Sequence, residues 1–152
     1  VAGFAMSADG ADMVLPSAVG AERTMRAALA DAALSPEAIG YINAHGTGTR
    51  ANDLAESTAI SAIFGADVAV SSTKGAHGHL IGAAGAVELL ACLLALNDGV
   101  LAPTAGWRLR DPACHIDVVT GGARRTCVTS CLSNAFAFGG LNAVLALNKP
   151  DK

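Results

Sequence analysis

Residues 71–88 read SSTKGAHGHLIGAAGAVE, and this stretch decides how the chain folds. It places Lys74, His79 and several glycines ahead of a long apolar segment that holds a single acid, Glu88. A segment this apolar predicts a buried helix over residues 80–96, with His79 at its N-terminal end. Burying polar groups at the start of an apolar helix costs free energy, so such groups usually serve a chemical function. The stretch therefore predicts a functional site.

The composition is that of one globular domain. The chain has 152 residues, of which 52% are apolar and 15% charged, with a net charge of −3. This balance excludes a disordered chain, and the lack of a basic stripe argues against nucleic-acid binding. Glu88 and the glycines of 80–96 argue against a membrane helix. The chain starts inside an apolar strand, which predicts that a longer protein supplies an upstream part.

The four cysteines do not form the paired C-x-x-C pattern of a zinc site. Cys92 lies in the apolar segment, and Cys127 and Cys131 are expected on one face of a strand. Cys114 and His115 could complete only a loose set of metal ligands. We interpret the cysteines as the reduced thiols of a cytoplasmic protein and predict no metal site.

Hydrophobic periodicity and turn residues predict an alternation of strands and helices. A short helical turn is expected at Ser35-Pro36-Glu37. The expected strands are 1–6, 39–44, 68–72, 127–133 and 141–148. One helix is expected over 18–33, capped by Ser17. A second helix is expected to be capped by Asn52 or Asp53 and to end at Phe64. Such an alternation, closed by a hairpin, predicts an α/β fold with a mixed sheet.

The first candidate site group is NAHGTGT, residues 43–49. His45 comes just after a strand and is followed by alternating glycine and threonine. An exposed imidazole among backbone N–H and hydroxyl donors suits a catalytic loop, and a plain turn with an incidental histidine is the alternative.

The second group is Lys74 with His79. A helix N-terminus disfavours a positively charged imidazole, so we expect a neutral His79 that keeps an N–H to donate. A buried Lys74 needs an acid, and Glu88 is the candidate partner. The alternative is a solvated Lys74. His77 is interpreted as part of the loop.

The third group is NAFAFGG, residues 134–140, which we expect to form an overlong apolar hairpin loop packed into a pocket wall. Its glycines allow backbone N–H groups to turn toward a bound oxygen, as an oxyanion hole requires. A tight connection with core phenylalanines is the alternative. All three groups are expected to follow strand ends, where ligands gather in open α/β sheets.

Together, NAHGTGT (43–49), STK…GHL…GAAG (72–85) and NAFAFGGLN (134–142) resemble the β-ketoacyl-ACP synthases, over residues 1–149. The resemblance is to the carboxyl-terminal half of that family's thiolase-like fold. It implies a half-domain with a mixed sheet, a buried central helix and flanking helices, spanning residues 1–152. The amino-terminal half, which carries the nucleophilic cysteine, is absent from this chain, so the chain alone is expected to be inactive.

The resemblance implies a decarboxylative Claisen condensation of malonyl-ACP with an acyl-cysteine thioester, in fatty acid or polyketide biosynthesis. His45, His79 and Lys74 match the catalytic residues. The remaining matches are Glu88, Phe138 and Gly139 in supporting roles, with the Phe138 N–H in the oxyanion hole, and Thr47, Thr49 and Phe136 in substrate binding.

The family has no cofactor of its own, because the phosphopantetheine arm belongs to the acyl carrier protein. The implied partners are that carrier, the upstream half and a second subunit, in a homodimer or a ketosynthase-like heterodimer. Arg108, Arg110, Arg124 and Arg125 could contact an acidic carrier, although a solvated face is the simpler interpretation.

Three departures from the usual family pattern affect specificity and loop motion rather than chemistry. Ala137 stands where a glycine is common, Leu141 replaces a common threonine, and Gly75-Ala76-His77 differs from the usual linker. A non-catalytic chain-length-factor subunit is the alternative function. A thiolase is a weaker one, because the second catalytic cysteine and G-H-P motif of that family are missing.

Overall fold

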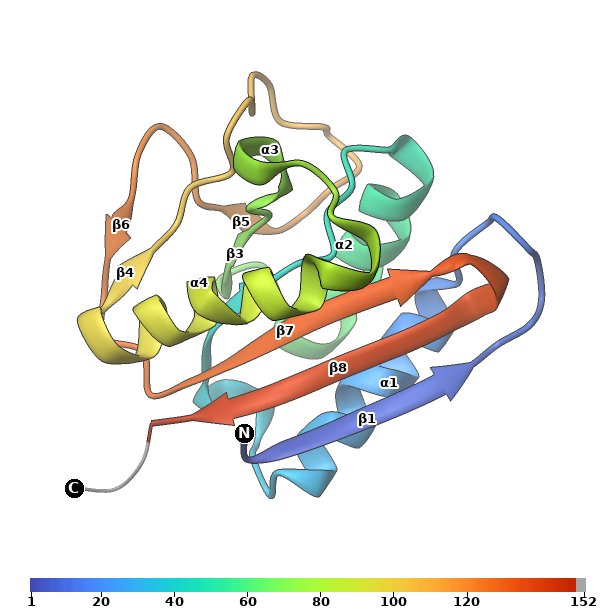
Figure 1. The fold of residues 1–152 in the computed structure, drawn as a ribbon, viewed down its shortest axis with the longest axis horizontal. Helices are drawn as coiled ribbons and strands as arrows, with labels where there is room; N and C mark the ends of the chain where they lie inside the picture. The colour runs from blue at the N-terminus through green and yellow to red at the C-terminus, as the bar shows by residue number, and fades with distance from the viewer. Residues whose placement is uncertain (150–152) are drawn as a thin grey trace.

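The computed structural model describes residues 1–149, which form a mixed six-stranded sheet with the strand order β1-β8-β7-β2-β3-β5 (Figure 1). The strands are β1 (Gly3–Ala8), β2 (Ile39–Asn43), β3 (Ala69–Ser71), β5 (Asp117–Val118), β7 (Ser130–Ala137) and β8 (Leu141–Asn148). β2, β3, β5 and β7 run parallel, whereas β8 is antiparallel to both β7 and β1. A small ribbon of β4 (Val100–Leu101) and β6 (Arg124–Arg125) lies apart from this sheet. The predicted mixed α/β architecture is confirmed.

Helices cover both faces of the sheet (Figure 1). α1 (Ala18–Asp31) and α2 (Arg50–Phe64) contact each other and enclose one apolar core, while α4 (Ala84–Asp98) crosses the opposite face over β7 and β2. The shorter helical pieces are α3 (Lys74–His77) and three 3₁₀ turns, η1 (Pro36–Ala38), η2 (Ile81–Ala83) and η3 (Phe138–Gly140). The result is a three-layer half-domain with a core on each side of the sheet.

The start of α2 differs from the prediction. Its cap is Thr49, which has an extended backbone and whose side-chain oxygen accepts a hydrogen bond from the Asn52 N–H at 3.4 Å. Asn52 and Asp53 therefore lie inside the first turn. The predicted end at Phe64 is confirmed, and the next residue, Gly65, has a φ of 71° that stops the helix. Ser17 caps α1 as expected, with its hydroxyl 3.1 Å from the Gly20 N–H.

The apolar helix begins at Ala84 rather than at residue 80, and only one of its faces is buried. The chain first forms α3 and η2, and Ile81 has a φ of +53°, a left-handed conformation that interrupts a helix. Cys92 and Glu88 are fully buried, but the outer face of α4 exposes Leu90, Leu93 and Leu94. The stretch Ile81–Asp98 is long and apolar enough to cross a membrane, yet its inner face packs on the sheet like a core helix.

The carboxyl-terminal hairpin also differs from the prediction. β7 begins at Ser130, so Cys127 lies before the strand, exposed, and does not share a strand face with Cys131. Pairing continues to Ala137 opposite Leu141, so most of the expected long loop is strand and only η3 connects β7 with β8. Gly139 and Gly140 have positive φ values and allow this tight turn.

The two ends of the described chain are neighbours in the sheet. β1 pairs with β8 from Gly3 opposite Ala146 to Ala8 opposite Leu141. α1, which directly follows the β1 loop, packs on both strands. On the outer edge of β1, the Phe4 N–H donates to the Asp31 carboxylate at 2.9 Å.

Candidate active site

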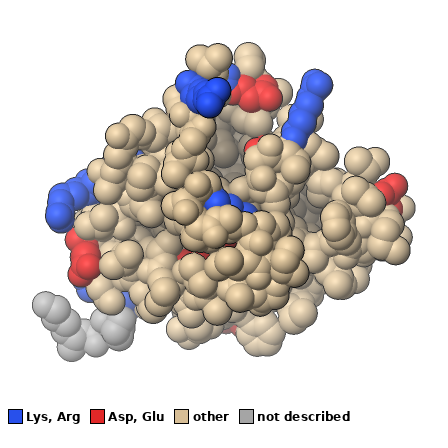
Figure 2. All heavy atoms as spheres, turned by 45° about the horizontal axis from the view of Figure 1, so that its top comes forward, with Lys and Arg blue, Asp and Glu red and all other residues tan. Residues whose placement is uncertain are grey.

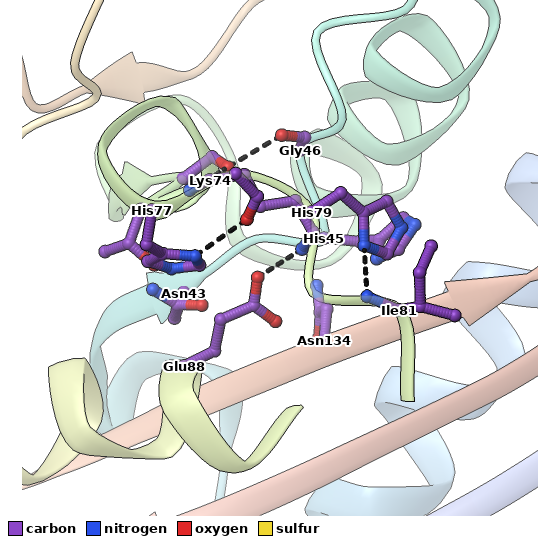
Figure 3. Close-up of polar contacts among 12 residues, drawn as sticks. Asn43, His45, Gly46, Lys74, His77, His79, Ile81, Glu88 and Asn134 are labelled. Atoms are coloured by element: carbon purple, nitrogen blue, oxygen red, sulfur yellow. Dashed lines mark hydrogen bonds and ion pairs between the residues drawn. The ribbon is translucent and has the colours of Figure 1, made fainter. Parts of the chain in front are cut away.

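The site lies where the parallel strands β2 and β3 end. His45 comes two residues after β2, and Lys74 comes three residues after β3. Figure 3 shows His45, from the loop after β2, beside Lys74 and His79, which both belong to the connection between β3 and α4, and Glu88 reaches them from α4. The expectation that the first two groups follow strand ends is confirmed, whereas residues 134–137 of the third group belong to β7 itself.

His45 is the most enclosed histidine of the site. Its ring meets the ring of His79 edge to face, with centroids 5.4 Å apart, and lies 5.8 Å from the ring of Phe136. Only 8% of His45 is exposed. Burial, followed by the positive charge of Lys74 and the neighbouring His79, lowers the pKa of His45 from its ordinary 6.5 to about 3. His45 is therefore a neutral imidazole near pH 7.

His79 is held differently from the prediction. It does not sit at the N-terminus of the apolar helix, because α4 begins five residues later, so the helix-dipole argument does not apply to it. Instead the Ile81 N–H donates to Nδ1 of His79 at 3.1 Å (Figure 3). With Nδ1 acting as the acceptor, the hydrogen of the neutral ring is on Nε2. The positive φ of Ile81 is part of the turn that makes this contact.

Lys74 and Glu88 form the predicted buried ion pair. The Lys74 side chain is 5% exposed and the Glu88 side chain is fully buried, and Nζ donates to Oε1 of the carboxylate. Because each group neutralises the other out of water, the solvated alternative for Lys74 is wrong. His77 belongs to the α3 turn, where its ring nitrogens contact Thr73 and the Gly78 carbonyl, as the loop interpretation predicted.

Glu56, which was not among the predicted site residues, holds the His45 loop in place. Its buried carboxylate accepts the backbone N–H groups of His45 and Gly46, both at 2.9 Å. The side-chain amides of Asn52 and Asn134 add contacts at 3.2 and 3.1 Å. Burial raises the pKa of Glu56, and these four donors oppose the rise.

Helical periodicity could have revealed Glu56. It lies four residues after Asn52 and four before Ile60, on the face of α2 that is buried. An acid on such a face needs several donors, and the nearby glycine-rich loop supplies two of them.

The threonines and the residues of the hairpin turn differ in burial and in their hydrogen-bond partners. The hydroxyls of Thr47 and Thr49 are 2.9 Å apart, but Thr49 also caps α2. Phe136 is buried against His45, whereas Phe138 is 73% exposed, so the expectation that both phenylalanines pack into a pocket wall is wrong for Phe138. The Gly139 N–H donates to the Met13 carbonyl at 2.8 Å. The substrate-binding and oxyanion roles of these residues stay predictions.

A cavity of about 600 Å³ opens beside the histidines, and Figure 2 shows a hollow at this end of the molecule between basic side chains. Lys74, His79, Thr47 and Trp107 are among its lining residues. Arg124 is bound to Asp117 through both carboxylate oxygens and is therefore engaged within the chain. Arg108 and Arg110 are exposed on the loop that borders the cavity.

Polar atoms without partners gather in the same place. Among residues 1–149, the buried side-chain atoms that lack a hydrogen-bond partner are Asn43 Oδ1, His45 Nδ1, Glu88 Oε2 and Asn134 Oδ1. All four belong to residues that Figure 3 places around the site. Buried polar atoms left unpaired usually mark a site where water or a bound group completes the bonds.

The pH dependence of stability is expected to report the burial of His45. Because the folded-state pKa lies near 3 and the unfolded value near 6.5, the unfolded chain binds the extra proton first as the pH falls. Through His45 alone, the free energy of unfolding should therefore fall by about 2 kcal/mol as the pH is lowered from 7 to 5. Urea denaturation at both pH values should show that the free energy of unfolding falls less for His45→Gln than for the wild type. His115→Gln, at an exposed position, should behave like the wild type, and equal losses in all three proteins would contradict the assignment.

Comparison with known proteins agrees with this geometry. The family model for the beta-ketoacyl synthase C-terminal domain matches residues 1–108. "Nodulation protein E" of Rhizobium sp. (strain N33) is 49% identical over 98% of this chain. "3-oxoacyl-[acyl-carrier-protein] synthase 2" of Synechocystis sp. (strain ATCC 27184 / PCC 6803 / Kazusa) is 42% identical over 97% of it. The chain spans only 38% and 36% of the lengths of these two relatives.

A solved structure described as "The ishigamide ketosynthase/chain length factor" superposes with a TM-score of 0.96 at 41% identity, covering 99% of this chain and 38% of that one. The sheet and its helix layers thus match the carboxyl-terminal half of the thiolase-like ketosynthase fold, and the family resemblance drawn from the motifs is confirmed. This chain belongs to the beta-ketoacyl synthase family, as its C-terminal domain.

Proposed function

We propose that this chain is the carboxyl-terminal half of a β-ketoacyl-[acyl-carrier-protein] synthase that condenses malonyl-ACP with an acyl-cysteine thioester. The observation that carries the proposal is the meeting of His45 and His79 beside the buried Lys74–Glu88 pair. Two imidazoles at this distance can both donate to one oxygen atom of a substrate.

The proposed chemistry needs hydrogen bonds that strengthen as charge develops. In malonyl-ACP the bond between C2 and the carboxylate breaks, carbon dioxide leaves, and the electron pair forms an enolate on the thioester oxygen. Neutral His45 and the Nε2–H of His79 donate to that oxygen more strongly in the transition state than in the ground state. The enolate carbon then attacks the acyl-thioester carbonyl, and the cysteine thiolate leaves.

The nucleophilic cysteine is proposed to come from the upstream half. Cys92 and Cys131 are fully buried between α4 and β7, and neither faces the histidines. A hydrogen bond with Cys92 and burial raise the pKa of the Cys131 thiol, which disfavours a thiolate there. Cys114 lines the cavity, but its thiol donates to the Asp53 carbonyl at 3.8 Å, and Cys127 is exposed ahead of β7. The exposed leucines on the outer face of α4 offer the upstream half an apolar surface to pack against.

Decarboxylation of malonyl-ACP by the full-length protein tests this function. His45→Ala and His79→Ala should each lower the rate of carbon dioxide release by about 100-fold or more, as expected for the loss of one oxyanion donor. His77→Ala is the matched control, because its ring contacts only its own turn. Rates for His45→Ala or His79→Ala equal to that of the wild type would refute the proposal.

A non-catalytic subunit of the chain-length-factor type is the second candidate, since the ishigamide ketosynthase/chain length factor is a structural neighbour. The intact His45, Lys74 and His79 favour the enzyme, because a subunit without chemistry has no use for them. The two functions differ at the upstream nucleophile position. A cysteine encoded there supports the synthase, and another residue supports the factor.

The proposed partners are an acyl carrier protein, which one relative's name includes, and a second ketosynthase subunit in a homodimer or heterodimer. The phosphopantetheine arm would come with the carrier. We place the enzyme in the cytoplasm, where such carriers would be met.

The exposed Arg108 and Arg110 border the cavity and are the candidates for contact with an acidic carrier. Arg108→Glu with Arg110→Glu should weaken carrier binding about tenfold at low salt and less at high salt, measured by fluorescence anisotropy. Arg23→Glu is the control, because Arg23 is exposed on α1 and does not line the cavity. Unchanged carrier affinity in the double variant would remove these residues from the docking surface.

A further inference from the structure

Ser72 lies between the two loops that carry His45 and Lys74. It is the first residue after β3, whose parallel pairing with β2 places Ser71 opposite Asn43. The Ala44 N–H continues this pairing by donating to the Ser71 carbonyl at 2.9 Å. The geometry brings Ser72 against the chain that has just passed His45.

The Ser72 hydroxyl contacts both loops. It donates to the Gly46 carbonyl at 2.6 Å and accepts the Lys74 N–H at 3.4 Å. The approach is close, because a Cβ atom added to Gly46 would lie 2.5 Å from the Ser72 Cβ, and Gly46 has a φ of +41°. Ser72 is only 8% exposed, so water does not replace the hydroxyl easily.

Gly46 is held from two sides. Its N–H donates to Glu56 and its carbonyl accepts from Ser72. Ser72 is itself anchored, because its N–H donates to the Thr104 hydroxyl at 3.2 Å. The single hydroxyl therefore links the histidine loop to the lysine turn, although these loops come from separate strand–helix units.

We propose that Ser72 is a positioning residue that keeps His45 in register with Lys74. Within residues 1–149 its hydrogen bonds go to the Gly46 carbonyl, the Lys74 N–H and the Thr104 hydroxyl rather than to the histidine rings or the ammonium group, so it acts through the backbone of Gly46 and Lys74. This inference rests on the proposed synthase function for its kinetic consequence, and a shift of an active-site group by a fraction of an ångström is enough to slow a reaction.

Ser72→Ala in the full-length protein tests the proposal. We expect kcat for malonyl-ACP decarboxylation to fall about tenfold or more, while KM changes less than twofold. The ¹⁵N signals of the His45 ring should shift as well. Ser57→Ala is the matched control: Ser57 is 2% exposed, but its hydroxyl bonds Leu54 within α2 at 3.1 Å and joins no two loops. This control should keep the wild-type kcat and His45 signals.

A folded Ser72→Ala protein with the wild-type kcat and His45 signals would overturn the proposal, and so would a Ser57→Ala protein with the same losses. If the wild type does not decarboxylate malonyl-ACP, the synthase function fails separately. The His45 signals then decide alone: a shift in Ser72→Ala supports the link between the loops, and unchanged signals refute it.

Discussion

Glu56→Ala is expected to lower the free energy of unfolding by about 3–5 kcal/mol. The carboxylate is 3% exposed and accepts four hydrogen bonds, two of them from the backbone N–H groups of His45 and Gly46. Each buried donor that loses its only partner costs about 1–3 kcal/mol. The loop that carries His45 should also lose its fixed position, so activity should fall together with stability.

Urea denaturation of the purified protein measures this loss. Glu22→Ala provides the control, since Glu22 forms a surface ion pair with Arg26 within α1 and should cost less than about 1 kcal/mol. The stability loss of Glu56→Gln should lie between those of Glu56→Ala and Glu22→Ala, because one carboxylate oxygen becomes an NH₂ group that faces other donors. A loss below about 1 kcal/mol for Glu56→Ala would contradict the role assigned to this carboxylate.

Glu88→Leu is expected to cost about 3–5 kcal/mol, because it leaves the Lys74 ammonium buried without its partner. Lys74→Met should cost a similar amount by leaving a buried carboxylate. The double variant replaces both charges with apolar groups and should recover most of the stability, although not the activity. A double-mutant cycle in urea measures the coupling. A double variant that is less stable than either single variant would contradict the pairing.

Much of the fold could be predicted because strand and helix periods are local signals. The strands at 39–44 and 68–72 and the stop of α2 at Gly65 agree with the structure to within one residue. The start of the apolar helix could not be predicted from hydrophobicity, because residues 80–83 are as apolar as the helix itself. Their path depends on the left-handed conformation of Ile81, which a β-branched residue adopts only under constraint.

Two members of the site show what the sequence reveals and what it hides. Lys74 and Glu88 could be paired because a buried charge requires its opposite, wherever the chain places it. Glu56 was missed because its partners are mostly backbone N–H groups, which leave no trace in residue type. The enclosure of His45 was also hidden, since it depends on Phe136 arriving from β7, 91 residues later.

The pairing of β1 with β8 sets the order in which this unit is completed during synthesis. Asn142 reaches Ser7 across 135 residues, which a ribosome takes roughly ten seconds to add. Until β8 is made, β1 packs on α1, and the edge of β1 that β8 will cover keeps its backbone N–H and C=O groups unpaired within this chain. Closing the sheet therefore comes last, and such long-range pairing predicts slow folding. A nascent chain cut short before β8 should remain open at this edge and prone to aggregate.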